Sequence, residues 1–172
     1  DTGKTVAVIG GGPGGMTAAY YLSLMGHQVT VYEQRPKLGG MLRYGIPDYR
    51  LPQEILDRDI DHILSAGVRV HTGVSIGRDL TMEDIQKSFD AVYIAIGAHV
   101  DKKLGLEGEE SSNVISAVEL LRGVGDGNVP DFTGKKICVI GGGNVSMDAT
   151  RTALRLGAES VTCVYRRRVE DM

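Results

Sequence analysis

A glycine-rich turn with one fixed spacing occurs twice in this chain of 172 residues, and it constrains the fold more than any other feature. The first copy, residues 10–15, reads G-G-G-P-G-G, and the second, residues 141–146, reads G-G-G-N-V-S. Each follows a short apolar, β-branched run and precedes a helical stretch that ends at a glycine, Gly26 or Gly157. This pattern predicts an α/β fold that contains an internal repeat of one βαβ unit, and not a solenoid.

The first copy has every part of a dinucleotide-binding fingerprint of the Rossmann type. Its glycines make the turn, let backbone approach a pyrophosphate and let the helix pack closely on the strand, while the helix N-terminus favours phosphate. Glu33, 18 residues after Gly15, can accept hydrogen bonds from both hydroxyls of an adenosine ribose. Its charge would repel a 2′-phosphate, so the site is predicted to hold FAD or NAD. The alternative is a purely structural turn with Glu33 solvated.

The second copy differs from the first at the end of the following strand, where the charge of the side chains favours one ligand over another. Ser146 replaces the third glycine, and the next strand ends at Tyr165, which three arginines follow, Arg166, Arg167 and Arg168. Arginine binds phosphate through two parallel hydrogen bonds, so Arg166 and Arg167 are predicted to hold the 2′-phosphate of NADPH. The alternative is a solvated basic surface. Two turns with opposite charge preferences predict two different cofactors.

Hydrophobic periodicity and turn residues predict the remaining elements. Residues 38–52 are predicted to form a long ordered loop, and 98–112 a crossover between a first domain at 1–100 and the start of a second at 101–172. The predicted strands are 5–9, 28–32, 68–71, 91–96, 136–140 and 161–165; the predicted helices are 16–25, a stretch from Pro52 to Gly67, a short helix capped by Thr81 and Asp84, 116–122 and 145–156.

Composition and charge exclude several classes of protein. The net charge is −3, so no basic excess attracts nucleic acid. Residues 6–26 carry no charge, but the glycine cluster would break a membrane-spanning helix, which favours a soluble, cytoplasmic chain. The histidines show no metal-ligand spacing, so no metal site is predicted. Cys138 and Cys163 form no C-x-x-C pair, as a disulfide reductase would need, and are predicted to be buried free thiols.

Three segments of the chain read V-A-V-I-G-G-G-P-G-G-M-T-A-A-Y-Y-L, G-G-M-L-R-Y-G-I-P-D-Y-R-L-P, and V-I-G-G-G-N-V-S-M-D-A-T-R-T-A-L-R-L-G-A with the later Y-R-R-R. With these segments the chain resembles the small, FAD- and NADPH-binding subunit of glutamate synthase and its relatives. The resemblance covers essentially the whole chain, and the second segment is the most specific because generic flavoproteins lack it. It implies a flavoprotein with two dinucleotide-binding domains, the NADPH domain inserted into the FAD domain. The chain then reads as a truncated piece that lacks the family's cysteine-rich segment and later parts.

The resemblance also assigns cofactor-binding positions. Val74 would offer backbone atoms to the adenine, and Gly97 would mark the exit from the FAD domain. The positions implied for FAD are Gly10, Gly12, Pro13, Gly14, Gly15, Glu33, Gln34, Gly39, Gly40, Met41, Leu42, Val74 and Gly97; those implied for NADPH are Gly143, Asn144, Val145, Asp148, Arg166 and Arg167.

In that family NADPH reduces the flavin by hydride transfer, and electrons pass to iron–sulfur clusters used by a partner. The cofactors carry this chemistry, so no catalytic side chain is predicted. With about half of the parts present, the chain is expected to be inactive alone. A single-cofactor nicotinamide dehydrogenase and a non-catalytic nucleotide-binding module remain the alternatives. The oligomeric state stays open, although exposed sheet edges would favour a homo-oligomer.

Overall fold

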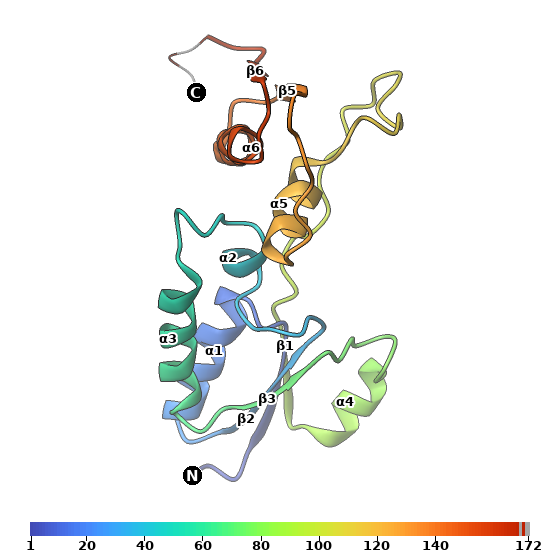
Figure 1. The fold of residues 1–172 in the computed structure, drawn as a ribbon. Coiled ribbons are helices and arrows are strands. Elements are labelled where there is room, and N and C mark those ends of the chain that lie inside the picture. Colours follow the sequence, from blue (N-terminus) through green and yellow to red (C-terminus); the bar gives the residue numbers. More distant parts are fainter. Residues whose placement is uncertain (169, 171–172) are drawn as a thin grey trace. The chain divides into compact units, whose positions relative to one another are not determined.

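A computed structural model describes residues 1–168 and 170, and it divides into two compact units (Figure 1). The first unit comprises residues 1–43 and 51–98, and the second comprises 44–50 and 99–172. The chain therefore leaves the first unit for seven residues and then returns to it. Residues 169, 171 and 172, which belong to the predicted second domain, lie outside the described residues.

The first unit is built on a parallel sheet of four strands in the order β3-β2-β1-β4 (Figure 1). Ile9, the last residue of β1, pairs with Tyr32 of β2 and Ile94 of β4. Because parallel strands end at the same edge of a sheet, the residues after β1, β2 and β4 gather along one edge. The strands are β1 (Thr5–Ile9), β2 (Gln28–Glu33), β3 (Arg69–Thr72) and β4 (Ala91–Ile94).

Two helices, α1 (Pro13–Leu24) and the amphipathic α3 (Gln53–Leu64), pack together on one side of this sheet (Figure 1). Apolar residues recur along α3 at spacings of three and four, which places them on one face. The core they form with the sheet consists of Val8, Met16, Ala19, Val29, Val31, Leu38, Leu56, Ile60 and Val68.

The ends of several predicted helices shift by a few residues. Helix α1 begins at Pro13 instead of Met16, because proline suits the first helical turn, where no N–H partner is needed. The loop predicted at 38–52 contains one short helix, α2 (Met41–Tyr44). The capping pair predicted for α4 (Met82–Ser88) is confirmed, since Thr81 and Asp84 form a reciprocal capping box.

The prediction that residues 91–96 form a buried strand is wrong in two respects. Strand β4 ends at Ile94, and Tyr93, Ile94 and Ile96 are all exposed. Its position explains this, because β4 is an edge strand of the sheet, and the short helix α4 makes few contacts with it.

The second unit repeats the β-α-β pattern on a smaller scale. Strands β5 (Lys136–Ile140) and β6 (Ser160–Val164) pair in parallel, and α6 (Asn144–Arg155) connects them. Helix α5 (Ala117–Gly125) packs against α6. Both strands alternate exposed with half-buried residues, because α6 covers one face of this two-stranded sheet.

This alternation corrects the prediction for the cysteines. Both thiols are free, but Cys138 is exposed, and Cys163 is half-buried with its Sγ donating to the Gly141 carbonyl. The apolar run around Cys138 suggested a strand buried on both faces, whereas the side chain points to the face that α6 does not cover.

Asp90 joins the beginning of β4 to the beginning of β1. One carboxylate oxygen accepts hydrogen bonds from the backbone N–H (2.9 Å) and the hydroxyl (3.0 Å) of Thr5, and the other accepts from the Lys4 ammonium at 2.9 Å. The hydrogen bond from the Thr5 backbone, followed by those from Lys4 and the Thr5 hydroxyl, lowers the pKa of Asp90 to about 2.

The lowered pKa makes a prediction about acid stability. A carboxyl whose pKa is lower in the folded than in the unfolded chain stabilises the fold above its unfolded pKa of about 3.9, and this contribution disappears as the pH falls towards 2. We expect Asp90→Asn to lower the urea midpoint at pH 6, and the gap from the wild type to close between pH 4 and pH 2. Asp61→Asn, on the exposed surface of α3, serves as the control. A gap that is the same at pH 6 and pH 2 would show that the charge of Asp90 is irrelevant.

Candidate functional site

The turn between β1 and α1 is made of backbone packed on backbone. Gly10 has a φ of +110°, and a Cβ there would lie 2.3 Å from the Ala95 carbonyl oxygen. A Cβ on Gly15 would lie 1.9 Å from the carbonyl oxygen of Gly10. Helix α1 begins after Gly12, and no side chain caps its first N–H groups. Pro13 and Gly14, in the first turn of the helix, are exposed. The turn therefore presents bare helical N–H groups at the edge of the sheet.

Glu33 lies directly against this turn. Its side chain is only 6% exposed, and its two carboxylate oxygens accept the N–H groups of Gly11 (2.7 Å) and Arg35 (2.8 Å). The alternative of an ordinary solvated acid is therefore wrong. Because a carboxylate oxygen has two lone pairs, each one retains a position for a further donor such as a hydroxyl.

The Gly39–Gly40 turn packs on the first glycine turn. Gly39 donates its N–H to the Gly11 carbonyl at 2.8 Å. Gly40 has a φ of +53°, and a Cβ there would lie 2.7 Å from the Gly12 Cα. The first residues of α2, Met41 and Leu42, follow this contact and are half-buried. The structure thus brings the predicted flavin-side residues to the β1–α1 turn.

The remaining positions assigned to FAD also follow strand ends at this edge. Val74 donates its N–H to the Glu33 carbonyl at 3.0 Å. Gln34 follows Glu33 and is exposed, and Gly97 is exposed just beyond Ala95, whose carbonyl faces Gly10.

The second glycine turn repeats the backbone geometry of the first. Gly10 donates its N–H to Tyr32, and Gly141 donates to Val164, in each case to the last paired residue of the neighbouring strand. The difference lies at the residue that follows, Glu33 in the first copy and Tyr165 in the second. In place of a carboxylate, the Tyr165 ring packs on the turn, and a Cβ on Gly142 would lie 2.6 Å from its atoms.

The positions assigned to NADPH differ in their exposure. Gly143, Asn144 and Val145 are exposed at the N-terminus of α6, which no side chain caps, and Arg166 and Arg167 are exposed after β6. Asp148 is different, because it is 4% exposed and one carboxylate oxygen accepts from the Arg50 guanidinium at 2.6 Å.

Sequence reasoning missed two arginines of the G-G-M-L-R-Y-G-I-P-D-Y-R-L-P segment. Arg50 pairs with Asp148 in the second unit. Arg43 is buried in the first unit, where it donates to the Leu38 carbonyl (2.5 Å) and to Gln53 (2.7 Å) and pairs with Asp57. The signal was present, since this segment is the most specific of the three that carry the resemblance, but sequence alone gave no partner for either arginine.

A family model described as pyridine nucleotide-disulphide oxidoreductase matches residues 4–169. The chain belongs to this family. It is 44% identical to the NADP(+)-dependent formate dehydrogenase subunit beta of Moorella thermoacetica, and the match covers 99% of this chain and 24% of that protein. It is 35% identical to the glutamate synthase [NADPH] small chain of Escherichia coli, over 99% of this chain and 38% of that protein. The chain thus spans about a quarter to two fifths of the length of these relatives.

The same fold occurs in FprA from Mycobacterium tuberculosis, with a TM-score of 0.81 and 23% sequence identity. That match covers 95% of this chain and 44% of FprA. The predicted Rossmann-like class is therefore confirmed, and so is the predicted resemblance to glutamate synthase small chains and related oxidoreductase subunits.

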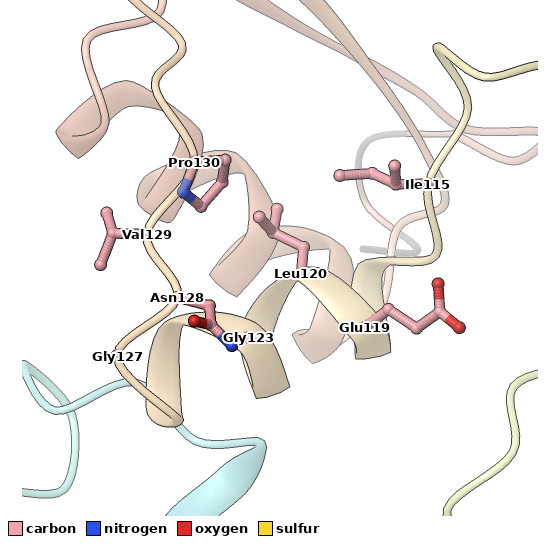
Figure 2. Close-up of a pocket in the computed structure, with 8 residues that line it drawn as sticks. All are labelled: Ile115, Glu119, Leu120, Gly123, Gly127, Asn128, Val129 and Pro130. Atoms are coloured by element: carbon pink, nitrogen blue, oxygen red, sulfur yellow. The ribbon is translucent and has the colours of Figure 1, made fainter.

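Among the described residues 1–168 and 170, no three His, Cys, Asp or Glu side chains gather in a way that could hold a metal ion. Within the same residues, no helix is both long and apolar enough to span a membrane. Figure 2 shows a shallow, mostly apolar hollow between α5 and residues 127–130, with Leu120 and Pro130 in its lining. No residue of either glycine turn contributes to this hollow.

Proposed function

We propose that the protein is an FAD-containing NADPH oxidoreductase that passes electrons to a partner. The first unit would bind FAD and the second NADPH, so that residues 1–100 and 101–172 correspond closely to the two cofactor domains. One observation carries the proposal: the two glycine turns have the same backbone pattern but are contacted by different side chains. The Glu33 carboxylate contacts Gly11 in the first turn, and the Tyr165 ring contacts Gly142 in the second. Relatives named for NADP(+) or NADPH support it.

The donor set of the first turn fits the adenosine and pyrophosphate parts of FAD. The uncapped N-terminus of α1 offers N–H groups and a partial positive charge to phosphate oxygens. The remaining lone pairs of Glu33 can accept ribose hydroxyls, and its negative charge disfavours a 2′-phosphate. Gly12 carries no side chain of its own, and a Cβ built there would lie 3.6 Å from the Gly40 Cα.

The second turn fits a nucleotide that carries a 2′-phosphate. The three atoms nearest to a Cβ built on its middle glycine, Gly142, all belong to the Tyr165 ring. Arg166 and Arg167 follow that ring, are exposed, and supply the planar donors that suit a phosphate. Gly143 and Asn144 would present the N-terminus of α6 to the pyrophosphate.

When bound, the two cofactors would supply the redox chemistry, in which the nicotinamide gives up a hydride and the flavin accepts it. The residues described here would bind and orient the nucleotides, and none of them is assigned a proton-transfer role. Relatives are named as subunits or chains of larger enzymes, which supports a partner subunit as the electron acceptor. We further propose that this partner, or an additional domain, carries iron–sulfur clusters.

The test is a visible absorption spectrum of the purified full-length protein, recorded before and after anaerobic addition of NADPH. The expected result is a yellow protein whose flavin absorbance is bleached by NADPH. Bleaching by NADH should be far slower. Replacing Arg166 and Arg167 together by alanine should weaken NADPH binding and leave the flavin in place. A colourless protein that still binds NADPH would instead favour a single-cofactor dehydrogenase, and a protein that binds nucleotides without any redox response would favour a non-catalytic module.

A further inference from the structure

The Arg43 guanidinium ties the loop after β2 to helix α3, and all of its partners lie in the first unit. Its Nε donates to the Leu38 carbonyl of the loop at 2.5 Å. Its Nη1 donates to the Gln53 side chain at 2.7 Å, and its Nη2 pairs with the Asp57 carboxylate. Because the three nitrogens of a guanidinium lie in one plane and point in fixed directions, they hold the loop and the helix in one arrangement.

The loop that Arg43 holds contains two glycines in an unusual conformation. Gly39 has a φ of +119° and Gly40 a φ of +53°, so both lie in the left-handed region. Glycine loses more backbone freedom on folding than any other residue, and two in succession keep one conformation only where contacts fix them. The hydrogen bond from Arg43 to the Leu38 carbonyl supplies such a contact directly before Gly39.

Two peptide groups then connect Arg43 to the first glycine turn. A trans peptide points its C=O and its N–H in opposite directions. The peptide between Leu38 and Gly39 accepts from the guanidinium through its C=O, and its N–H donates to the Gly11 carbonyl at 2.8 Å. The N–H on the other side of this second peptide belongs to Gly12, the N-cap of α1, and points away from the loop. A chain of hydrogen bonds thus leads from the guanidinium to the N-terminus of α1.

We infer that Arg43 is a positioning residue for the pyrophosphate of FAD, because it fixes and polarises the N–H of Gly12. A positive charge at the start of the chain polarises both peptides in the same direction, so the last N–H becomes a stronger donor to a phosphate oxygen. The inference rests on the proposed function and goes beyond it, because Arg43 is buried and would act only through the backbone of the loop. Loss of the guanidinium should therefore weaken FAD binding more than it weakens the fold.

The experiment compares wild type with Arg43→Met and Arg43→Lys in the full-length protein. Methionine fills much of the space of arginine, and apolar side chains often replace a buried ion pair with little loss of stability. The Asp57 carboxylate is 56% exposed, so water can solvate it when its partner is removed. The Kd of FAD is measured by fluorescence titration of the apoprotein, and the urea midpoint by circular dichroism.

For Arg43→Met we expect the Kd of FAD to rise by about 10-fold to 100-fold, the range for loss of one hydrogen bond to a charged group. Arg43→Lys keeps the charge and one donor position and should recover part of the affinity. An Arg43→Met protein that binds FAD as tightly as wild type would overturn the inference. If Arg43→Met does not fold, Arg43→Lys decides, and wild-type affinity in that variant would overturn the inference in the same way.

Two control variants separate this role from a general loss of stability. Arg58→Ala removes an exposed arginine of α3 and should change neither the Kd nor the urea midpoint. Asp90→Asn acts at the opposite edge of the sheet, where β1 and β4 begin, and should lower the midpoint without changing the Kd. If Asp90→Asn raised the Kd of FAD as much as Arg43→Met does, the effect of Arg43 would be one of stability alone, and the inference would be wrong.

A second readout needs no cofactor. Lys-C protease cleaves after lysine, and the exposed Lys37 directly precedes the buried residues 38–40. In the apoprotein, release of the loop should accelerate cleavage after Lys37 in Arg43→Met and not in Arg58→Ala. Unchanged cleavage would show that Arg43 does not fix the loop and would overturn the inference. A wild-type protein that binds no FAD would instead overturn the proposed function, and the inference with it.

Discussion

Replacing Gly15 by alanine is expected to unfold the first unit or to destabilise it by about 3 kcal/mol or more. The added Cβ would lie 1.9 Å from the Gly10 carbonyl oxygen and 3.2 Å from a methyl group of Val8. The first neighbour is backbone and cannot rotate away, and Gly10 is itself fixed against the Ala95 carbonyl. The helix must therefore move off the strand, which opens the core cluster to which Met16 and Val8 belong.

The matched control for this prediction is Gly14→Ala, one residue away in the same helix. A Cβ on Gly14 meets nothing within 4 Å, and its φ is not in the left-handed region. Alanine there should leave stability unchanged or raise it by about 0.5–1 kcal/mol, since glycine is a poor helix former. Urea denaturation followed by circular dichroism measures both variants. Equal midpoints for the two would contradict the packing of α1 on β1 described above.

Glu33→Gln is expected to destabilise the first unit by about 2 kcal/mol, despite the near-identical shape of the two side chains. Two backbone N–H groups, from Gly11 and Arg35, point at the two carboxylate oxygens. A carboxamide has one acceptor oxygen and an NH2 group, so one buried N–H would face another donor. Under the proposed function, the variant should also bind FAD more weakly, because one acceptor for a ribose hydroxyl is lost.

Glu54→Gln, at an exposed position in the first turn of α3, provides the control for the loss of one negative charge. Denaturant midpoints and FAD affinity by fluorescence quenching are compared for both variants. If Glu33→Gln were as stable as Glu54→Gln, the hydrogen bonds from Gly11 and Arg35 would contribute little to the fold.

The fold was largely predictable because its constraints are local. The runs that end at Ile9 and Ile140 are short and β-branched, and each glycine turn requires a backbone that other residues cannot adopt. The spacing to Glu33 also predicted correctly that this residue lies at the first turn, since the register of β1 with β2 fixes where β2 ends.

What sequence could not show is which side chains pair across long separations. Arg50 and Asp148 lie far apart in the chain, and neither has a sequence neighbour that indicates the pairing. The prediction that two strands are buried was wrong for a related reason. The run around Ile94 and the run around Cys138 resemble buried parallel strands, but burial of a sheet face depends on what covers it, and periodicity does not report this.

The Asp90 contacts join two strands that are neighbours in the sheet but far apart in the sequence. Pairing β1 with β2 joins Val6 to Val29, whereas pairing β1 with β4 joins Val6 to Ala91. Closing the longer loop costs about 1.2 kcal/mol more chain entropy, because this cost grows with the logarithm of loop length. Asp90 contacts Thr5 and Lys4 at the point where that loop closes. The hydrogen bonds of one exposed aspartate thus lie where the most distant pair of strands in the sheet comes together.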